Sequence, residues 1–225
     1  SGYVKNVAAS QPTPRMSSSI LLGGVAVDRD DVGADTYTGF RLTALWQPIE
    51  SLDITLGYIY QEIEQDGQPE VNLLLSGDYE QRRLNTGIEG SSYESLNNEI
   101  GITNLVINYD LGWAELTSSS SWVDYDSNLS TDLNHFLSGF GGPYYGPNID
   151  DTDTFAEELR LSSRLDGPLQ FVAGIYYEKR ENTRDVRWNW SGDAGSDPGI
   201  ALVTRDNYAE LEQKAFFGEV SYAIT

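Results

Sequence analysis

Residues 52–60, LDITLGYIY, decide the fold class of this chain. Large apolar side chains occupy the even positions, and the odd positions are mostly small or polar. Because successive side chains of a strand point to opposite faces, this alternation predicts a β-strand with one apolar and one polar face. Residues 40–47 alternate in the same way. Residues 48–51 separate the two stretches as a tight turn, in which proline fixes φ and interrupts the hydrogen-bond ladder.

The same unit recurs along the chain, whereas helical periodicity is nearly absent. The turns Asp110-Leu111-Gly112 and Leu165-Asp166-Gly167-Pro168 each join two alternating stretches, and Asp-Gly is a strong hairpin signal because both residues tolerate positive φ. The chain is therefore predicted to be all-β and antiparallel, with roughly eight strands. The predicted strands are residues 2–8, 40–47, 52–60, 100–110, 113–125, 154–164, 169–179 and 215–225.

The connections between these strands alternate in length. Short turns lie near Pro48, Gly112 and Gly167, and the predicted long polar connections are residues 9–35, 65–98, 127–153 and 187–210. Several strands reach the ~9–11 residues that a tilted membrane strand needs, against ~5–6 in globular proteins. Outer-membrane barrels have short periplasmic turns and long extracellular loops. The pattern therefore predicts the wall of an antiparallel transmembrane β-barrel.

Aromatic residues gather toward both ends of the predicted strands, as the amphipathic rings of membrane barrels do at the two headgroup regions. Those beside the short turns are Trp46, Tyr109 and Trp113, and those toward the long connections are Tyr58, Tyr60, Tyr176 and Tyr177. The opposite face of the strands is expected to line the barrel lumen. Its predicted members are Arg41, Thr43, Asp53, Thr55, Glu158, Arg160 and Gln170.

Composition excludes several classes of protein. The net charge of −21 repels nucleic-acid phosphates, so nucleic-acid binding is not expected. The absence of cysteine excludes a disulfide scaffold, a thiolate metal site and a cysteine nucleophile. No signal peptide opens the chain, and no apolar run is long enough for a transmembrane helix. A mean hydropathy of −0.40 is compatible with a membrane barrel, because only alternate residues of its strands face lipid.

Several stretches resemble the barrel of TonB-dependent receptors. Residues 155–163, FAEELRLSS, followed by residues 166–177, DGPLQFVAGIYY, are similar to the family's hairpin pattern E-x-R-L-x-S … G-x-x-x-W-x-x-G-x-Y-Y, with Phe171 where tryptophan is frequent. Residues 37–60, with W-Q-P … L-D-I-T-L-G-Y, resemble another hairpin of these barrels. Residues 2–7, GYVKNV, resemble the G-Y-x-x-N strand that precedes it.

The resemblance implies that residues 1–225 are part of a receptor barrel in the bacterial outer membrane, without the plug domain of the family. Such barrels have about 22 strands, so roughly eight strands would be one part of the wall. The implied function is energy-coupled uptake of a scarce nutrient such as a siderophore, vitamin or carbohydrate. The implied partners are outer-membrane lipid, a small-molecule ligand and, through the plug domain, the TonB complex. No enzyme activity and no cofactor are expected.

Aromatic residues in two long connections are candidates for ligand binding, because exposed rings on loops suit stacking against a sugar or a siderophore. These candidates are Phe140, Tyr144, Tyr145, Trp188 and Trp190. Self-packing of the long connections explains the same residues equally well. No catalytic constellation is present, and the serines at 118–121 lack a nucleophile-elbow sequence. They are expected to be strand residues that face the lumen or a neighbouring strand.

Two acidic clusters raise a calcium hypothesis, since calcium takes closely spaced oxygen ligands. One comprises Asp28, Asp30, Asp31 and Asp35, and the other Asp150, Asp151 and Asp153. Neither has EF-hand spacing, and solvated acidic loops are the stronger interpretation. A bridge through divalent cations to anionic lipopolysaccharide is a further hypothesis. His135 is the only histidine, so a transition-metal site is not expected.

Two alternatives to the receptor interpretation remain open at this stage. A small closed outer-membrane barrel with a structural or adhesive role requires residues 2–8 to pair with residues 215–225. A soluble all-β carbohydrate-binding module requires the apolar strand faces to meet in a compact core. An enzyme is the least supported class, although 35 acidic residues leave a carboxylate pair open.

Overall fold

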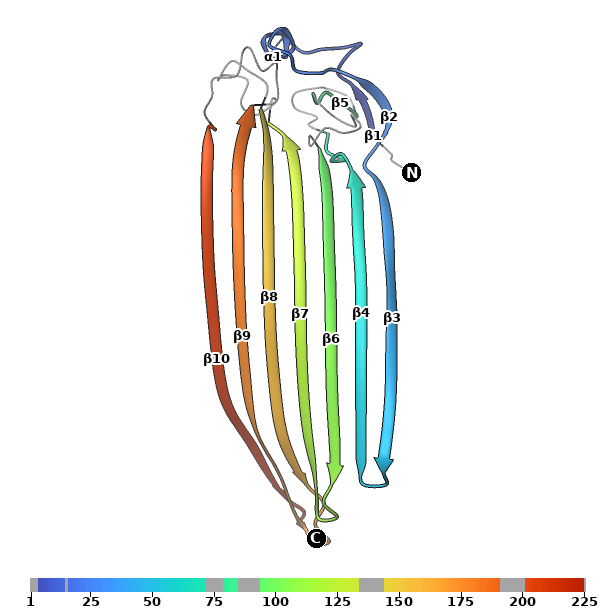
Figure 1. Ribbon diagram of the computed structural model, residues 1–225, viewed down its shortest axis with the longest axis vertical. Coiled ribbons are helices and arrows are strands. Elements are labelled where there is room, and N and C mark those ends of the chain that lie inside the picture. Colours follow the sequence, from blue (N-terminus) through green and yellow to red (C-terminus); the bar gives the residue numbers. More distant parts are fainter. Residues whose placement is uncertain are drawn as a thin grey trace.

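The computed structural model describes residues 4–14, 16–71, 79–84, 94–133, 144–190 and 201–224. One antiparallel seven-stranded sheet forms the body of the molecule, in the order β10-β9-β8-β7-β6-β4-β3 (Figure 1). Strands that follow one another along the chain are neighbours in this sheet, and β3 and β10 form its two edges. Its members are β3 (Ala34–Ile49), β4 (Leu52–Asp66), β6 (Ser95–Asp110), β7 (Ala114–Asp132), β8 (Tyr144–Ser163), β9 (Leu169–Trp190) and β10 (Val203–Tyr222).

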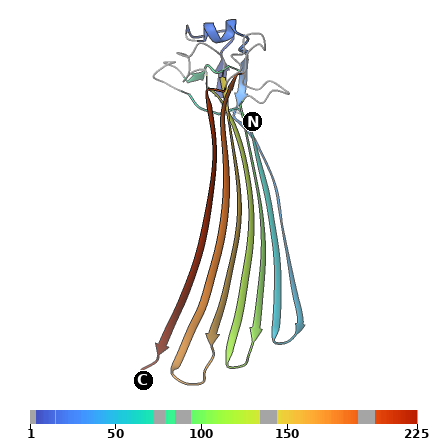
Figure 2. The same cartoon turned by 60° about the vertical axis from the view of Figure 1, so that its left-hand side comes forward.

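A second, three-stranded sheet lies beyond the long-connection end of the large sheet (Figures 1 and 2). In it β1 (Val4–Val7) pairs antiparallel with β2 (Asp28–Val32) and parallel with β5 (Glu80–Gln81). The short helix α1 (Ser17–Leu21) lies beside this sheet, and we refer to residues 4–32 and 79–84 together as the cap. No helix among the described residues is long and apolar enough to cross a membrane.

The antiparallel all-β prediction is confirmed, with a correction to the number of strands in the large sheet. The large sheet has seven strands rather than roughly eight, because the predicted first strand, residues 2–8, contributes β1 to the cap instead. The closed-barrel alternative required this segment to pair with the last strand. In the structure β1 pairs with β2 and β5, so β3 and β10 are the two edges of an open sheet.

The strands extend much farther than the sequence pattern indicated. β9 contains 22 residues, which at about 3.3 Å per residue correspond to about 70 Å. The hydrocarbon core of a bilayer is about 30 Å thick, so a strand of this length exceeds that thickness. The predicted long connections 127–153 and 187–210 were therefore too long. Most of their described residues continue β7, β8, β9 and β10.

Alternation produces two chemically distinct faces, because residues paired across antiparallel strands share a face. The apolar face carries Leu42, Ala44, Trp46, Leu52, Ile54, Leu56, Leu105, Ile107, Tyr109, Leu116, Leu159, Leu161, Leu169, Phe171, Ala173, Ile175, Phe216, Val220 and Tyr222. These residues form a band in the half of the sheet next to the short turns. The band shifts along the strand direction from one strand to the next, and it comprises residues 52–60 on β4 and 169–177 on β9. Strands of a barrel are staggered in the same way.

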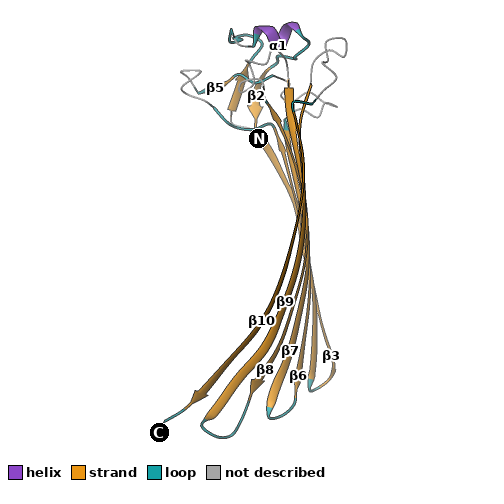
Figure 3. Ribbon diagram, turned by 90° about the vertical axis from the view of Figure 1, so that its left-hand side faces the viewer, coloured by secondary structure: helices purple, strands orange, loops and turns teal. Residues whose placement is uncertain are grey.

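This band is not covered by any other described part of the chain. Leu42, Trp46 and Leu56 remain 63%, 64% and 50% exposed, respectively. The buried cluster Ala8, Met16 and Leu84 lies in the cap instead. Figure 3 shows the large sheet edge-on as a single curved layer. The soluble-module alternative required apolar faces packed against each other, and the described residues contain no such layer.

Candidate functional site

The predicted lumen-facing residues lie together on the face opposite the apolar band, which we call the polar face. Its residues include all seven predicted ones: Arg41, Thr43, Asp53, Thr55, Glu158, Arg160 and Gln170. Polar side chains bond to one another across strands here. The hydroxyl of Thr117 donates to the Asn108 side-chain oxygen over 2.9 Å, and that of Ser127 donates to the Asn98 side-chain oxygen over 2.6 Å. The shared face confirms the alternation.

Three of the predicted ligand-binding aromatics meet at the far end of the polar face. Tyr144 is paired with Trp190 across β8 and β9, and their rings contact edge to face with centroids 5.3 Å apart. Trp188 lies two residues before Trp190 on β9 and therefore on the same face of the sheet. We call Tyr144, Trp188 and Trp190 the mouth cluster. Both tryptophans belong to strand β9, not to a loop as the sequence analysis assumed.

The other two predicted aromatics do not join the mouth cluster. Tyr145 is paired with Asn189, so it lies on the opposite face of the sheet. Phe140, like His135, lies outside the described residues. Tyr144 itself is only 4% exposed, so in this conformation its ring serves packing more than contact with solvent.

Gly146 provides the space in which the mouth cluster packs. A Cβ atom on Gly146 would lie 2.9 Å from Leu133 Cδ1 and 3.2 Å from Trp188 Cδ1. Contacts this close force neighbouring side chains to move, so only glycine lets Trp188 and Leu133 approach the β8 backbone. The predicted long connection 127–153 includes this glycine. Gly146, which lies among polar and aromatic residues, was the sequence feature that could have indicated close packing against the β8 backbone.

Aromatic rings mark the limit of the apolar band toward the cap. Phe40 contacts Tyr58 and Tyr60, each with centroids 5.7 Å apart, and Trp122 contacts Phe155 at 5.3 Å. Phe155 also contacts Tyr177 at 6.2 Å. We call these six residues the aromatic row. Tyr176, which the sequence analysis placed with Tyr177, points to the polar face, as its pairing with Glu158 shows.

One polar group interrupts the apolar face just below the aromatic row. Ser118 donates a hydrogen bond to Glu157 over 2.7 Å, and Ser120 donates to the other oxygen of the same carboxyl. Ser119 and Ser121 lie on the polar face. The serine run therefore serves both faces, in line with the prediction that these are strand residues facing the lumen or a neighbouring strand.

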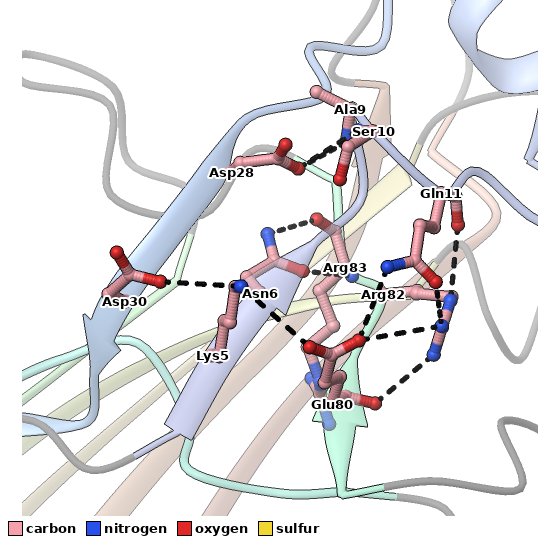
Figure 4. A network of polar contacts seen from close by, with 10 residues as sticks. All are labelled: Lys5, Asn6, Ala9, Ser10, Gln11, Asp28, Asp30, Glu80, Arg82 and Arg83. Atoms are coloured by element: carbon pink, nitrogen blue, oxygen red, sulfur yellow. Dashed lines mark hydrogen bonds and ion pairs between the residues drawn. The ribbon is translucent and has the colours of Figure 1, made fainter.

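The acidic clusters proposed for calcium are dispersed by the fold. Asp28 accepts hydrogen bonds from the backbone N–H groups of Ala9 and Ser10, each over 3.0 Å, and the Ser10 bond in particular lowers the Asp28 pKa (Figure 4). Asp30 pairs with Lys5, and Asp150 with Arg184. Within the described ranges, no three acidic or histidine side chains are placed to hold one metal ion.

A buried polar network joins the cap to the large sheet. The Asn6 side chain bonds to both the backbone N–H and the backbone carbonyl of Arg83, each over 2.9 Å (Figure 4). The Arg83 guanidinium lies 2.5 Å from Glu94, whose side chain is fully buried beside the start of β6. Glu94 also accepts the backbone N–H of Asp132, and Asp132 accepts that of Leu84. Burial raises the pKa of Glu94, although Arg83 opposes the shift.

The comparisons with known proteins concern the fold. No protein-family model and no curated protein matches the sequence. Among solved structures, the chain is similar to the crystal structure of the ferric citrate transporter FecA in the unliganded form, with a TM-score of 0.58 and 12% sequence identity. The match covers 85% of this chain and 28% of the FecA chain, so the chain spans under a third of that protein. The seven-stranded sheet is thus an antiparallel barrel wall like that of an outer-membrane transporter.

Proposed function

We propose that this chain forms part of the barrel wall of a TonB-dependent receptor in the bacterial outer membrane and contributes to energy-coupled uptake of a small nutrient. The observation that carries the proposal is the two-faced sheet. An uncovered apolar band about one bilayer-spanning strand long lies opposite a hydrogen-bonded polar face. The similarity to part of a ferric citrate transporter supports the transport class.

In this proposal the apolar face contacts lipid and the polar face lines the lumen. The open edges at β3 and β10 expose unpaired backbone groups, which are too costly to leave in hydrocarbon. Further strands of a larger barrel therefore pair with both edges. The plug domain and its contact with TonB belong to parts of the receptor beyond residues 1–225. The cap and the mouth cluster then lie at the extracellular end, where a ligand is first captured.

Trp190 of the mouth cluster is the residue whose loss is expected to weaken ligand capture. It lies at the end of β9 on the lumen side, in contact with the packed ring of Tyr144. A stacking aromatic contributes a large share of the binding energy at such sites. In cells that depend on the full-length protein, Trp190→Ala should raise the concentration for half-maximal uptake about tenfold. Trp113→Ala, beside a short turn at the other end, is the matched control.

The uptake assay uses a panel of ferric chelates, cobalamin and oligosaccharides as labelled probes. Deletion of the protein should abolish uptake of one probe, and deletion of TonB should abolish uptake of the same probe. Uptake that continues at the wild-type rate without TonB would refute energy coupling. Equal uptake by the Trp190→Ala and Trp113→Ala variants would remove the mouth cluster from the proposal and leave the barrel assignment in place.

A further inference from the structure

A hollow of about 570 Å³ opens on the apolar face, immediately above the aromatic row. Gly101 lies in the row of paired residues between Tyr60 and Asp124, and its missing side chain leaves space in the surface. The walls toward the apolar band are the rings of Tyr58, Tyr60, Trp122 and Phe155. This hollow lies on the opposite face from the mouth cluster, so it is separate from the proposed route of the nutrient.

Carboxylates form the other wall of the hollow. They come from four neighbouring strands: Glu99, Asp124, Asp126, Asp153 and Glu181. Lys179 is the one basic side chain among the described lining residues, and it already lies 2.8 Å from Glu181 and 3.8 Å from Glu210. Asp126 lies beyond the bilayer-spanning part of β7. Burial and the nearby carboxylates of Asp151 and Asp124 raise its pKa. The negative charge in the hollow thus exceeds the positive charge that faces it.

We propose that this hollow binds the ammonium group of a membrane lipid headgroup, and the inference rests on the proposed placement of the apolar face in a bilayer. Aromatic faces attract a cation through their quadrupoles, and carboxylates accept hydrogen bonds from each N–H of a primary ammonium. The aromatic row places the hollow at the level of the lipid headgroups. The acyl chains of the same lipid lie along the apolar band directly below, over Leu56 and Leu105.

The charge of the hollow selects among lipids. A headgroup that carries only a phosphate is repelled by the carboxylate wall, whereas a headgroup with a terminal amine presents the opposite charge to it. A free amine would meet the same rings and carboxylates but would lack the apolar contacts below. An amine attached to a lipid is therefore the occupant that contacts both the hollow and the apolar band below it.

The test compares two lipids that share acyl chains. The full-length protein is purified in detergent with equal amounts of phosphatidylethanolamine and phosphatidylglycerol, and the retained lipids are counted by native mass spectrometry. Wild type should retain the amine lipid about tenfold more than the glycerol lipid. The double variant Asp124→Asn/Asp126→Asn should lose this preference. The control Asp166→Asn/Glu219→Gln removes two carboxylates outside the hollow and should keep it.

Three results would overturn the inference: equal retention of both lipids by wild type, an unchanged preference in the Asp124→Asn/Asp126→Asn variant, or displacement of the lipid by an equal concentration of free ethanolamine. Membrane fractionation of the same variants separates this outcome from a failure of the proposed function. A protein that stays in the outer membrane without lipid preference refutes only the hollow. A wild-type protein that is recovered in the soluble fraction refutes the barrel-wall proposal itself.

Discussion

Replacing Leu56 with arginine is expected to lower the free energy of unfolding of the protein in a bilayer by about 2–4 kcal/mol. Leu56 lies at the middle of the alternating stretch of β4, paired with Ala44 on one side and Leu105 on the other, within the apolar face. In the proposed placement of the apolar face, an arginine at this height brings a charge to the bilayer midplane, where only snorkelling reduces its cost. Equilibrium urea titration of the full-length protein in lipid vesicles measures the change.

The adjacent residue provides the matched control. Thr55 occupies the next position of the same strand but lies on the polar face, paired with Leu45 and Val106. Thr55→Arg introduces the same charge at the same height of the strand, on the face that is proposed to line a water-filled lumen. Its expected cost is below about 1 kcal/mol, as for other exposed surface substitutions. Equal costs for the two variants would show that the faces do not meet different solvents.

The second large effect is expected in the cap. Arg83→Met removes the cation that lies beside the fully buried carboxyl of Glu94. Loss of one partner of a buried ion pair leaves an uncompensated charge, and the cap should lose about 3–5 kcal/mol of local stability. Hydrogen exchange reports this directly at the backbone N–H groups of Leu84 and Asp132, which this network holds. Glu70→Gln is the control, because Glu70 is a 74% exposed partner of the same Arg83.

The pH dependence of the Arg83→Met variant follows from the raised pKa of Glu94. A carboxyl whose pKa is higher in the folded than in the unfolded state supports folding while it is protonated, and its contribution is lost as pH rises through the folded pKa. Without Arg83 the pKa should rise farther, because burial is then unopposed. The protection factor of the Leu84 amide, which is its exchange rate corrected for the intrinsic pH dependence of amide exchange, should therefore be higher in mildly acidic than in neutral solution. The opposite trend would mean that Glu94 is ionised and satisfied by other groups.

The positions of the strands, and the face on which each side chain lies, could be predicted because both depend on local alternation of apolar and polar residues. Residues 52–60 already separate Ile54 and Leu56 from Asp53 and Thr55, and pairing in register preserves this separation across the sheet. The extent of the strands could not be predicted. Beyond the aromatic row both faces become polar, as in the stretch from Thr183 to Arg187, so alternation ends while the backbone ladder continues.

The cap and the mouth cluster depend on contacts between residues far apart in the sequence. Asn6 and Arg83 are 77 residues apart, and neither belongs to a pattern that signals a buried network. The segment at residues 2–8 was predicted to be a strand, yet its partners β2 and β5 lie in stretches that read as polar loops. Tyr144 and Trp190 become neighbours only because β8 and β9 continue past their alternating parts.

Thiol accessibility along β4 tests the placement of the two faces most directly. Residues 1–225 contain no cysteine, so a single cysteine introduced at 54, 55, 56 or 57 is the only thiol in this part of the protein. A full-length protein without the introduced cysteine measures the background labelling. In the full-length protein in intact outer membranes, a charged thiol reagent should label positions 55 and 57, whereas positions 54 and 56 should be labelled only by a lipid-soluble reagent. Uniform labelling by the charged reagent, or labelling of 54 and 56 in place of 55 and 57, would contradict a lipid-facing apolar band.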